Sequence, residues 1–179
     1  LNISSPADPA ELGKILFDYS FKKRGPSYIR LTGVPGSPYL YKKNYDYKFG
    51  NPTTISKGKD MLILSTGSVS AQALNALDIL KKKNISVQLI NIHTIKPLNK
   101  KILMLIKRFK NIIIIEEHSS VGGLSSSIFE IIAKNNLKKN ILNLNLSNRF
   151  GPTGTYNYLL NYHNLSAKKI AKKIVEKFR

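Results

Sequence analysis

The hydrophobic positions after Asp60 follow two alternating patterns. Short runs of apolar residues, as at 112–115, are strand-sized and predict buried β-strands. Between these runs, apolar residues recur three or four positions apart, which predicts helices with one buried face. The expected strands cover 61–65, 86–92, 112–115 and 141–146, and the expected helices cover 69–80, 99–109, 124–133 and 167–178. Repeated strand–helix–strand units predict an α/β domain over 60–179, with a mainly parallel sheet and helices on both faces.

Residues 1–33 predict a helix and a strand that have too little surface to form a domain alone. Asp8 can cap a helix with Pro9 at its first position, and Glu11 completes a capping box. Apolar residues on one face continue this helix for several turns, and β-favouring residues follow at 27–32. We therefore interpret this segment as a helix–strand remnant of a second α/β domain.

Residues 34–59 follow neither the helical nor the strand period. Glycine and proline are frequent here, and four tyrosines lie among them: Tyr39, Tyr41, Tyr45 and Tyr47. Such punctuation predicts a linker. Because tyrosine side chains bury a large apolar surface, we expect the linker to pack against the domains rather than to move as a tether.

The formal net charge of +19 at first suggests nucleic acid or an anionic membrane as a partner. The excess is almost all lysine, and the basic pairs and one basic triple are spread along the sequence. They fall at 42–43, 81–83, 138–139, 168–169 and 172–173. Base recognition relies on arginine and on aromatic residues. We therefore interpret the lysines as solvated surface and expect no nucleic-acid partner.

The chain contains no cysteine and no apolar run of the roughly 18 residues that a membrane span needs. No basic and apolar leader is recognised at its start. Disulfides and cysteine catalysis are excluded. We expect a soluble, cytoplasmic protein without a membrane partner.

Glu116, Glu117 and His118 end the isoleucine-rich strand, and Gly122 and Gly123 open the next helix. The carboxyl ends of parallel strands are where α/β proteins place ligands. The three side chains could therefore form an acid/base pair or supply two ligands to a metal. Because no third metal ligand follows at a suitable spacing, a structural role in the strand-end loop or a subunit contact is favoured.

Three further loops carry polar residues. Ser65–Ser68 turns from a strand into a helix, and Gly67 could expose main-chain amides to an anion. The turn lacks the glycine pattern of nucleotide sites, so an ordinary helix start is favoured. Residues 93–98 and 148–154 predict rigid loops, the second with Arg149 as a possible anion contact.

Six short motifs follow one another along nearly the whole chain. They are Pro6-Ala7-Asp8-Pro9-Ala10-Glu11, Gly25-Pro26-Ser27-Tyr28-Ile29-Arg30-Leu31, Ser65-Thr66-Gly67-Ser68, His93-Thr94-Ile95-Lys96-Pro97-Leu98, Glu116-Glu117-His118 with Gly122-Gly123-Leu124, and Phe150-Gly151-Pro152-Thr153-Gly154. In this order they resemble the transketolase family, as the end of its pyrimidine-binding domain followed by its whole C-terminal domain. Deoxyxylulose-phosphate synthases and the β subunits of 2-oxoacid dehydrogenases share the plan, but the Ile-Lys-Pro-Leu and Glu-Glu-His motifs look more like transketolase.

The resemblance implies an enzyme that transfers ketol units between sugars with thiamine diphosphate and a divalent metal, Mg²⁺ or Ca²⁺. It also implies a dimer with active sites between the subunits, acting on a sugar phosphate or a related sugar. The family's cofactor-activating glutamate lies upstream of Asp8, and the diphosphate and metal belong to another domain. We therefore expect no catalytic, cofactor-binding or metal-binding residue in this chain, inactivity on its own, and an N-terminal subunit or upstream half as its partner.

In the light of the resemblance, five residues are expected at a subunit interface or along one wall of the substrate channel. They are Glu117, His118, Gly122, Gly123 and Arg149.

The family usually has an arginine that meets the substrate phosphate three residues beyond the position of Arg30, where this chain has Gly33. Glycine cannot supply a charge-assisted phosphate contact. This departure leaves open an alternative function, a non-catalytic interaction module that retains the C-terminal fold.

Overall fold

The computed structural model describes residues 1–22, 24–32, 39–41, 45–148 and 150–179. Its strands are β1 (Asn2–Ser4), β2 (Ser27–Ile29), β3 (Thr53–Ser56), β4 (Met61–Thr66), β5 (Val87–Asn91), β6 (Thr94–Lys96), β7 (Asn111–Glu116) and β8 (Asn140–Leu144). Its helices are α1 (Pro9–Phe21), α2 (Ser70–Lys81), α3 (Lys101–Arg108), α4 (Leu124–Lys134), α5 (Tyr156–Tyr162) and α6 (Ala167–Phe178). Among the described helices, none has the length and apolar character of a membrane span.

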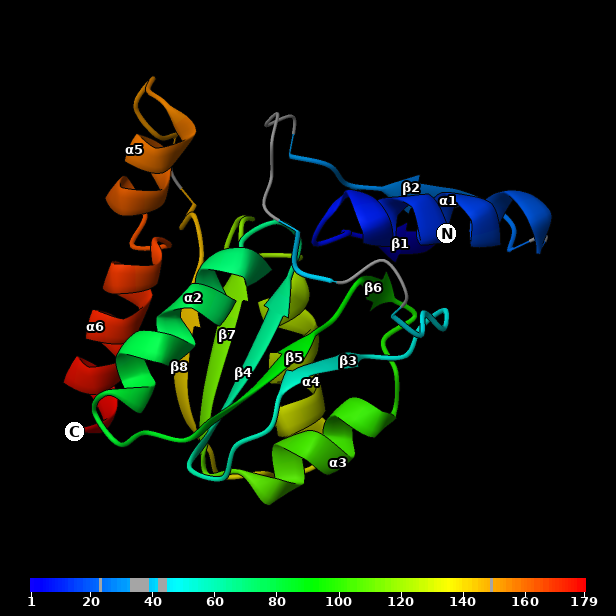
Figure 1. Ribbon diagram of the computed structural model, residues 1–179. Helices are drawn as coiled ribbons and strands as arrows, with labels where there is room; N and C mark the ends of the chain where they lie inside the picture. Colours follow the sequence, from blue (N-terminus) through cyan, green and yellow to red (C-terminus); the bar gives the residue numbers. More distant parts are fainter. Residues whose placement is uncertain (23, 33–38, 42–44, 149) are drawn as a thin grey trace.

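A five-stranded sheet with the order β3-β5-β4-β7-β8 forms the centre of the molecule (Figure 1). Strands β4, β5, β7 and β8 are parallel, and β3 runs antiparallel to β5 at one edge. All six residues of β4 and five of the six in β7 are buried. Burial on both faces explains why these strands are continuous apolar runs in the sequence. The predicted α/β class and mainly parallel sheet are confirmed.

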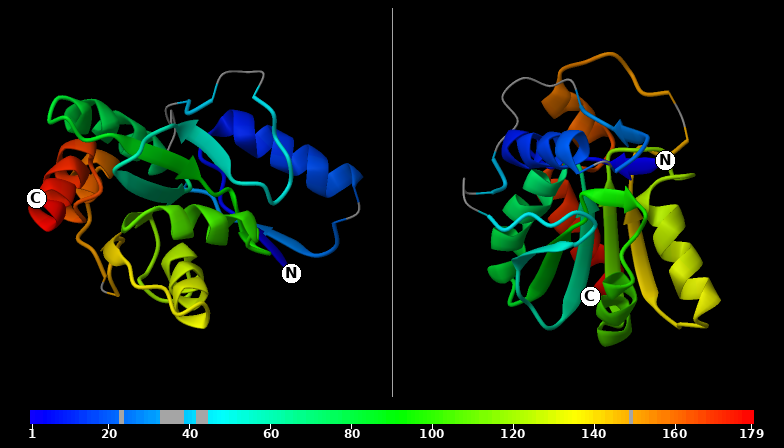
Figure 2. Two further views of the ribbon diagram at one scale, coloured as in Figure 1. Left: turned by 90° about the horizontal axis from the view of Figure 1, so that it is seen from below. Right: turned by 90° about the vertical axis from the view of Figure 1, so that its right-hand side faces the viewer.

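Helices cover both faces of this sheet, with α2 and α6 on one side and α3 and α4 on the other (Figure 2). Successive side chains of a strand point to opposite faces. Accordingly, Ile113 packs in the cluster of α2 and α6, whereas Ile112 and Ile114 pack in the cluster of α3 and α4. Each face of the sheet is thus closed by its own apolar core.

The N-terminal segment forms a second, smaller sheet with the order β2-β1-β6 beyond the carboxyl ends of β4 and β7 (Figure 1). Strand β1 is parallel to β2 and antiparallel to β6. Helix α1 begins as predicted, because the Asp8 carboxylate accepts a hydrogen bond from the Glu11 main-chain N–H. The reciprocal bond differs in detail, since the Glu11 carboxylate accepts from the N–H of Ala7 rather than of Asp8.

Four elements were not anticipated from the sequence: β1, β3, β6 and α5. Strand β3 lies in the stretch interpreted as a linker, and β6 lies in the loop predicted at 93–98. The expected packing of the linker holds for Tyr41, which is buried and stacks on Tyr45 with 3.9 Å between ring centroids, but Tyr39 is exposed. The domain boundaries placed at residues 33 and 59 stay predictions.

Candidate functional site at the junction of the two sheets

A small cavity lies where the N-terminal segment meets the carboxyl ends of β4 and β7. Its volume is about 130 Å³, and we call it the junction cavity. It is lined by Ile3, Ser5, Tyr28, Arg30, Thr66, Ile95, Glu116, Glu117, His118, Gly122 and Gly123. It therefore brings together four of the five residues that the sequence predicts for an interface or channel. The cavity is well below the roughly 300 Å³ of a typical ligand pocket.

Glu116 is buried and acts as a remote cap for helix α4. Its carboxylate accepts hydrogen bonds from the main-chain N–H of Leu124 at 2.7 Å and of Ser125 at 2.8 Å, and from the Ser125 hydroxyl. A negative charge at a helix N-terminus is favourable, because the first N–H groups lack intrahelical partners. A Cβ atom on Gly123 would collide with this carboxylate. The Glu116 carboxylate is thus committed to the helix start.

Glu117 connects three separate parts of the chain. Its Oε2 accepts hydrogen bonds from the Tyr156 hydroxyl at 2.9 Å and the Ser68 hydroxyl at 3.0 Å. The Thr32 hydroxyl lies 2.9 Å from the same Ser68 oxygen and donates to it. Burial raises the pKa of Tyr156 to about 12, and the charge of Glu117 adds to the increase. The phenol therefore stays protonated at neutral pH and remains a donor to the carboxylate.

His118 and Gly122 shape the loop that follows β7. The His118 carbonyl accepts a hydrogen bond from the N–H of Leu146 at 2.9 Å, and its ring Nδ1 lies 3.3 Å from the Ser119 carbonyl oxygen. Gly122 has a φ of 81°, a left-handed conformation that glycine adopts readily. These contacts support the structural role that the sequence favours for the loop.

A second polar cluster fastens α1 to β5, and we call it the Glu11 cluster. The fully buried Glu11 carboxylate accepts from the N–H of Ala7 at 2.7 Å and from the Asn91 side-chain amide at 3.1 Å to each oxygen. The Asn91 amide also lies 2.7 Å from the Tyr41 hydroxyl, and the Tyr45 hydroxyl donates to Glu11 at 3.3 Å. Burial raises the pKa of Glu11 to about 7. The cluster joins the N-terminal segment, the linker and the later domain.

The Ser65–Ser68 turn is covered by the N-terminal segment. A Cβ atom on Gly67, whose φ is 72°, would lie 2.8 Å from the hydroxyl oxygen of Ser5. The Ser68 hydroxyl is engaged in the Glu117 network. Ser5 of the N-terminal segment therefore occupies the position beside Gly67 at which an anion would approach the turn.

Within the described residues, no group of three or more His, Cys, Asp or Glu side chains could hold a metal ion. His93 is buried with its Nδ1 2.8 Å from the Thr94 hydroxyl oxygen, and burial lowers the pKa of its imidazole to about 4. Because both carboxylates at the junction cavity are engaged in fastening roles, we assign them no catalytic step.

Two predicted residues, Gly33 and Arg149, lie outside the described residues. The sequence did not predict that Tyr156 and the Glu11 cluster take part in the junction. A capping glutamate looks the same in the sequence whether or not it also contacts a distant asparagine. The residues that meet Glu11 and Glu117 are 34 to 80 and 39 to 49 positions away, respectively.

Residues 50–170 match the profile of the transketolase C-terminal domain. The chain is 32% identical over 158 residues to a protein from Methanocaldococcus jannaschii described as a transketolase C-terminal section, covering 87% of this chain and 49% of that protein. It is 34% identical over 175 residues to a 1-deoxy-D-xylulose-5-phosphate synthase from Dictyoglomus thermophilum, covering 97% and 28%. It is 28% identical over 173 residues to the 6-deoxy-6-sulfo-D-fructose transketolase subunit SqwH from a Clostridium species, covering 96% and 53%. The chain thus spans about half the length of its transketolase relatives, and less of the synthase.

Solved structures agree with this match. A split-gene transketolase solved as an inactive β4 tetramer superposes with a TM-score of 0.87 at 26% identity, covering 98% of this chain and 57% of that one. A transketolase mutant from Pichia stipitis shares the fold, with a TM-score of 0.65 at 15% identity over 98% of this chain and 25% of that one. The chain therefore belongs to the transketolase C-terminal domain family and is homologous to the C-terminal sections of transketolases and 1-deoxy-D-xylulose-5-phosphate synthases.

Proposed function

We propose that this chain is the C-terminal part of a thiamine-diphosphate-dependent transketolase that transfers ketol units between sugars, and that it is inactive alone. The observation that carries the proposal is the junction, where the buried Glu11 cluster and the partly buried Glu117 network hold the N-terminal segment against the later α/β layers. In the proposal, the N-terminal segment belongs to a second domain. Holding this segment in a fixed position matters because the rest of the second domain assembles on it.

The exposed side of α1 supports an upstream partner. Phe17 and Phe21 are 60% and 72% exposed and stack with 4.8 Å between ring centroids, and Leu16 beside them is 47% exposed. Neighbouring exposed apolar side chains of this size mark a surface that another protein segment covers. The partner in the proposal is the N-terminal transketolase section, as a separate subunit or as the upstream half of the same chain.

In this proposal, Glu117, His118, Gly122 and Gly123 position the two domains relative to each other. The Glu117 network holds the turn before α2, the segment that follows β2, and α5 in one arrangement. Holding reacting groups in fixed geometry is a large part of enzymatic rate enhancement. The four residues therefore act through orientation, as part of a subunit interface or channel wall, and the complete enzyme is proposed to work as a dimer in the cytoplasm.

Thiamine diphosphate with a divalent metal would supply the carbanion chemistry in the complete enzyme. In the proposal, the N-terminal segment of this chain completes the pyrimidine-binding domain, whose remaining residues belong to the upstream half. The substrate is proposed to be a sugar phosphate or a related anionic sugar. The uncharged Gly33 favours an acceptor whose terminal group is held elsewhere, and the relative named for 6-deoxy-6-sulfo-D-fructose shows that sugars with other end groups occur among similar proteins.

The test is calorimetric titration of thiamine diphosphate and Mg²⁺ into this chain, into the upstream half, and into their mixture. The proposal expects heat of binding and ketol transfer in the mixture, and neither with this chain alone. Assembly of the two halves without cofactor binding would favour the non-catalytic module, which Gly33 also suggests. Absence of any assembly would reject both the proposed partner and the proposed enzyme.

A further inference from the structure

The charged residues separate toward two ends of the molecule. Six of the ten acidic residues belong to the N-terminal segment, the linker or the carboxyl end of β7: Asp8, Glu11, Asp18, Asp46, Glu116 and Glu117. The opposite end, at the amino ends of the parallel strands, is dominated by lysine and arginine. This end lies at the bottom of Figure 1.

The parallel topology produces the concentration of positive charge. Strands β4, β5, β7 and β8 begin side by side, with Met61 paired to Val87 and to Asn111, and Asn111 paired to Asn140. The connection before each strand is basic, and so is the end of α6. Together they carry Lys57, Lys59, Lys81, Lys82, Lys83, Lys107, Arg108, Lys110, Lys138, Lys139, Lys177 and Arg179, twelve of the 29 basic residues, which we call the basic end.

Within the described part of the chain, the positive charges of the basic end are not neutralised by ion pairs. None of the twelve side chains lies within 4.0 Å of an Asp or Glu carboxylate. Lys139 instead donates to the main-chain carbonyls of Lys107 and Phe109, at 3.1 and 2.7 Å. The acidic residues among or next to these positions are Asp60, Asp78 and Glu176, the last of which pairs with Lys172 and Lys173. Twelve basic residues against three carboxylates make the field of the basic end positive.

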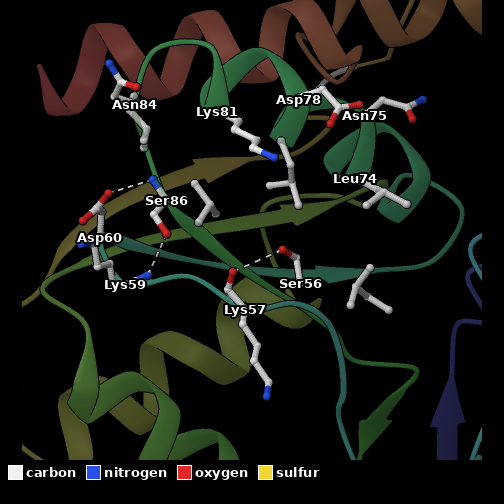
Figure 3. A pocket seen from close by; sticks show the side chains of 14 residues that line it. Ser56, Lys57, Lys59, Asp60, Leu74, Asn75, Asp78, Lys81, Asn84 and Ser86 are labelled. Carbon is white, nitrogen blue, oxygen red and sulfur yellow. Dashed lines mark hydrogen bonds between the residues drawn. The ribbon is translucent and has the colours of Figure 1, made fainter.

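Two hollows open at the basic end. One lies between α2 and the sheet edge, has a volume of about 880 Å³ and is bordered by Lys57, Lys59 and Lys81 (Figure 3). The other has a volume of about 690 Å³ and is lined by Lys110, Asn111, Lys139, Asn140, Ile141, Lys177, Phe178 and Arg179. Four adjacent strands about 4.8 Å apart make the basic end about 15 Å wide. Along the axis of a double helix, the phosphates of one strand repeat about every 3.4 Å, so that width spans roughly four of them.

The side chains at the basic end favour one class of polyanion. None of the large apolar residues exposed on the described surface lies in its connections, so it lacks an anchor for insertion into a membrane. Its two aromatic rings are Phe109, which is buried, and Phe178, which is partly buried, so it offers no row of exposed rings on which single-stranded nucleic acid would stack its bases. Lysine-rich surfaces attract backbone phosphates without reading sequence. These features fit a nucleic-acid duplex.

We propose that the basic end binds duplex nucleic acid through its phosphates, without sequence preference, as an activity separate from ketol transfer. About four phosphate contacts predict a slope of about −3.6 for the logarithm of the association constant against the logarithm of salt concentration, at about −0.9 per contact. The basic residues are widely separated in the sequence. The fold nevertheless brings the four connections that precede β4, β5, β7 and β8, together with the end of α6, to the same end of the molecule.

The experiment measures binding of a fluorescent 20-base-pair duplex to the full-length protein that contains this chain, at salt concentrations from 50 to 300 mM. The test variant is K82E/K83E/K110E at the basic end. The matched control, K96E/K168E/K169E, reverses three exposed lysines outside the basic end, one in β6 and two in the first turn of α6. At 1.5 Å per residue of helix, Lys169 lies about 12 Å from Lys177, which is more than the Debye length of about 10 Å in 0.1 M salt.

At 0.1 M salt, the test variant should bind the duplex at least about tenfold more weakly than the unmodified protein, and the control less than about threefold. Melting temperatures of the variants check that the fold is retained. Equal losses in the two variants would show that overall charge is sufficient and would overturn the proposal. Stronger binding to vesicles with 30% anionic lipid, or a single-stranded probe preferred over the duplex, would overturn it as well.

Discussion

At the scale of single residues, the junction depends on groups that have no freedom to vary in size or in hydrogen bonding. Glu116 is bound by three donors, and Gly123 leaves the space that its carboxylate occupies. Glu117 links Ser68 and Tyr156, which are far apart in the sequence. Small substitutions at these positions should therefore have measurable effects on stability.

Gly123→Ala should destabilise the protein by about 1–3 kcal/mol, because the added methyl group meets the Glu116 carboxylate and must displace it from the start of α4. Chemical denaturation measures the change. Gly13→Ala is the matched control, since a Cβ atom there has no neighbour within 4 Å and the position is inside a helix. That variant should be neutral or stabilising by up to about 1 kcal/mol. Equal effects of the two substitutions would contradict this account.

Tyr156→Phe should destabilise the protein by about 1 kcal/mol, because it removes the donor to Glu117 and leaves the packing of the ring unchanged. Tyr158→Phe is a suitable control, since the Tyr158 side chain is about half exposed on the same helix. If Tyr158→Phe proved as destabilising as Tyr156→Phe, the Glu117 network would have no particular role in stability.

Glu11 should make stability fall as pH rises from about 4.5 to about 7. Its pKa is raised by burial from 4.5 to about 7, so the folded state binds more protons than the unfolded state in that window. His93 acts in the opposite sense, because its lowered pKa makes stability rise between about pH 4 and 6.5. The contribution of Glu11 to stability is therefore measured as the difference in the free energy of unfolding between the original protein and a variant that lacks the Glu11 carboxylate.

Glu11→Gln keeps a neutral side chain at all pH values and isolates this contribution. The free energy of unfolding of the original protein minus that of the variant should fall by an amount on the order of 3 kcal/mol between pH 4.5 and 8. Denaturant titrations at several pH values provide the measurement. A difference that stays constant with pH would mean that folding does not change the pKa of Glu11.

At the scale of elements, the sequence predicts well what local chemistry determines. The cap at Asp8 and the apolar period placed α1, and the isoleucine run of β7 identified a strand buried on both faces. The strands β1, β3 and β6 have three or four residues each, which is too short for a period of two to be recognised. They become strands because a partner strand satisfies their main-chain groups, and that information is tertiary.

For the candidate site, the sequence predicted the position of the residues but not their partners. Glu116, Glu117 and His118 could be placed at a strand end, and therefore at the edge where the junction forms. Their partners could not be identified, because the contact to Tyr156 requires knowing how α5 lies relative to β7. The sequence thus indicated the location of the site but not the fastening role of its carboxylates.

At the scale of the whole molecule, the exposed face of α1 should be essential for assembly and dispensable for the fold. Phe17→Asp with Phe21→Asp should abolish association with the upstream half, because it places two charges on a surface proposed to be buried there. Met104→Asp, on the 64% exposed side chain of α3, is the control. Analytical ultracentrifugation of the mixed halves measures the association. Assembly that survives the double substitution would place the partner on another surface.

Strand β6 makes the order of synthesis matter for the N-terminal segment. Residues 2–4 leave the ribosome well before residues 94–96, with which one edge of their strand pairs. At about 5–20 residues per second, β1 waits roughly 5–20 seconds for this neighbour. During that interval β1 can pair with β2 on one edge, while the edge that later receives β6 exposes unpaired main-chain groups. Such an edge is a template for pairing with another strand, so the late arrival of β6 leaves the nascent segment open to wrong strand pairing.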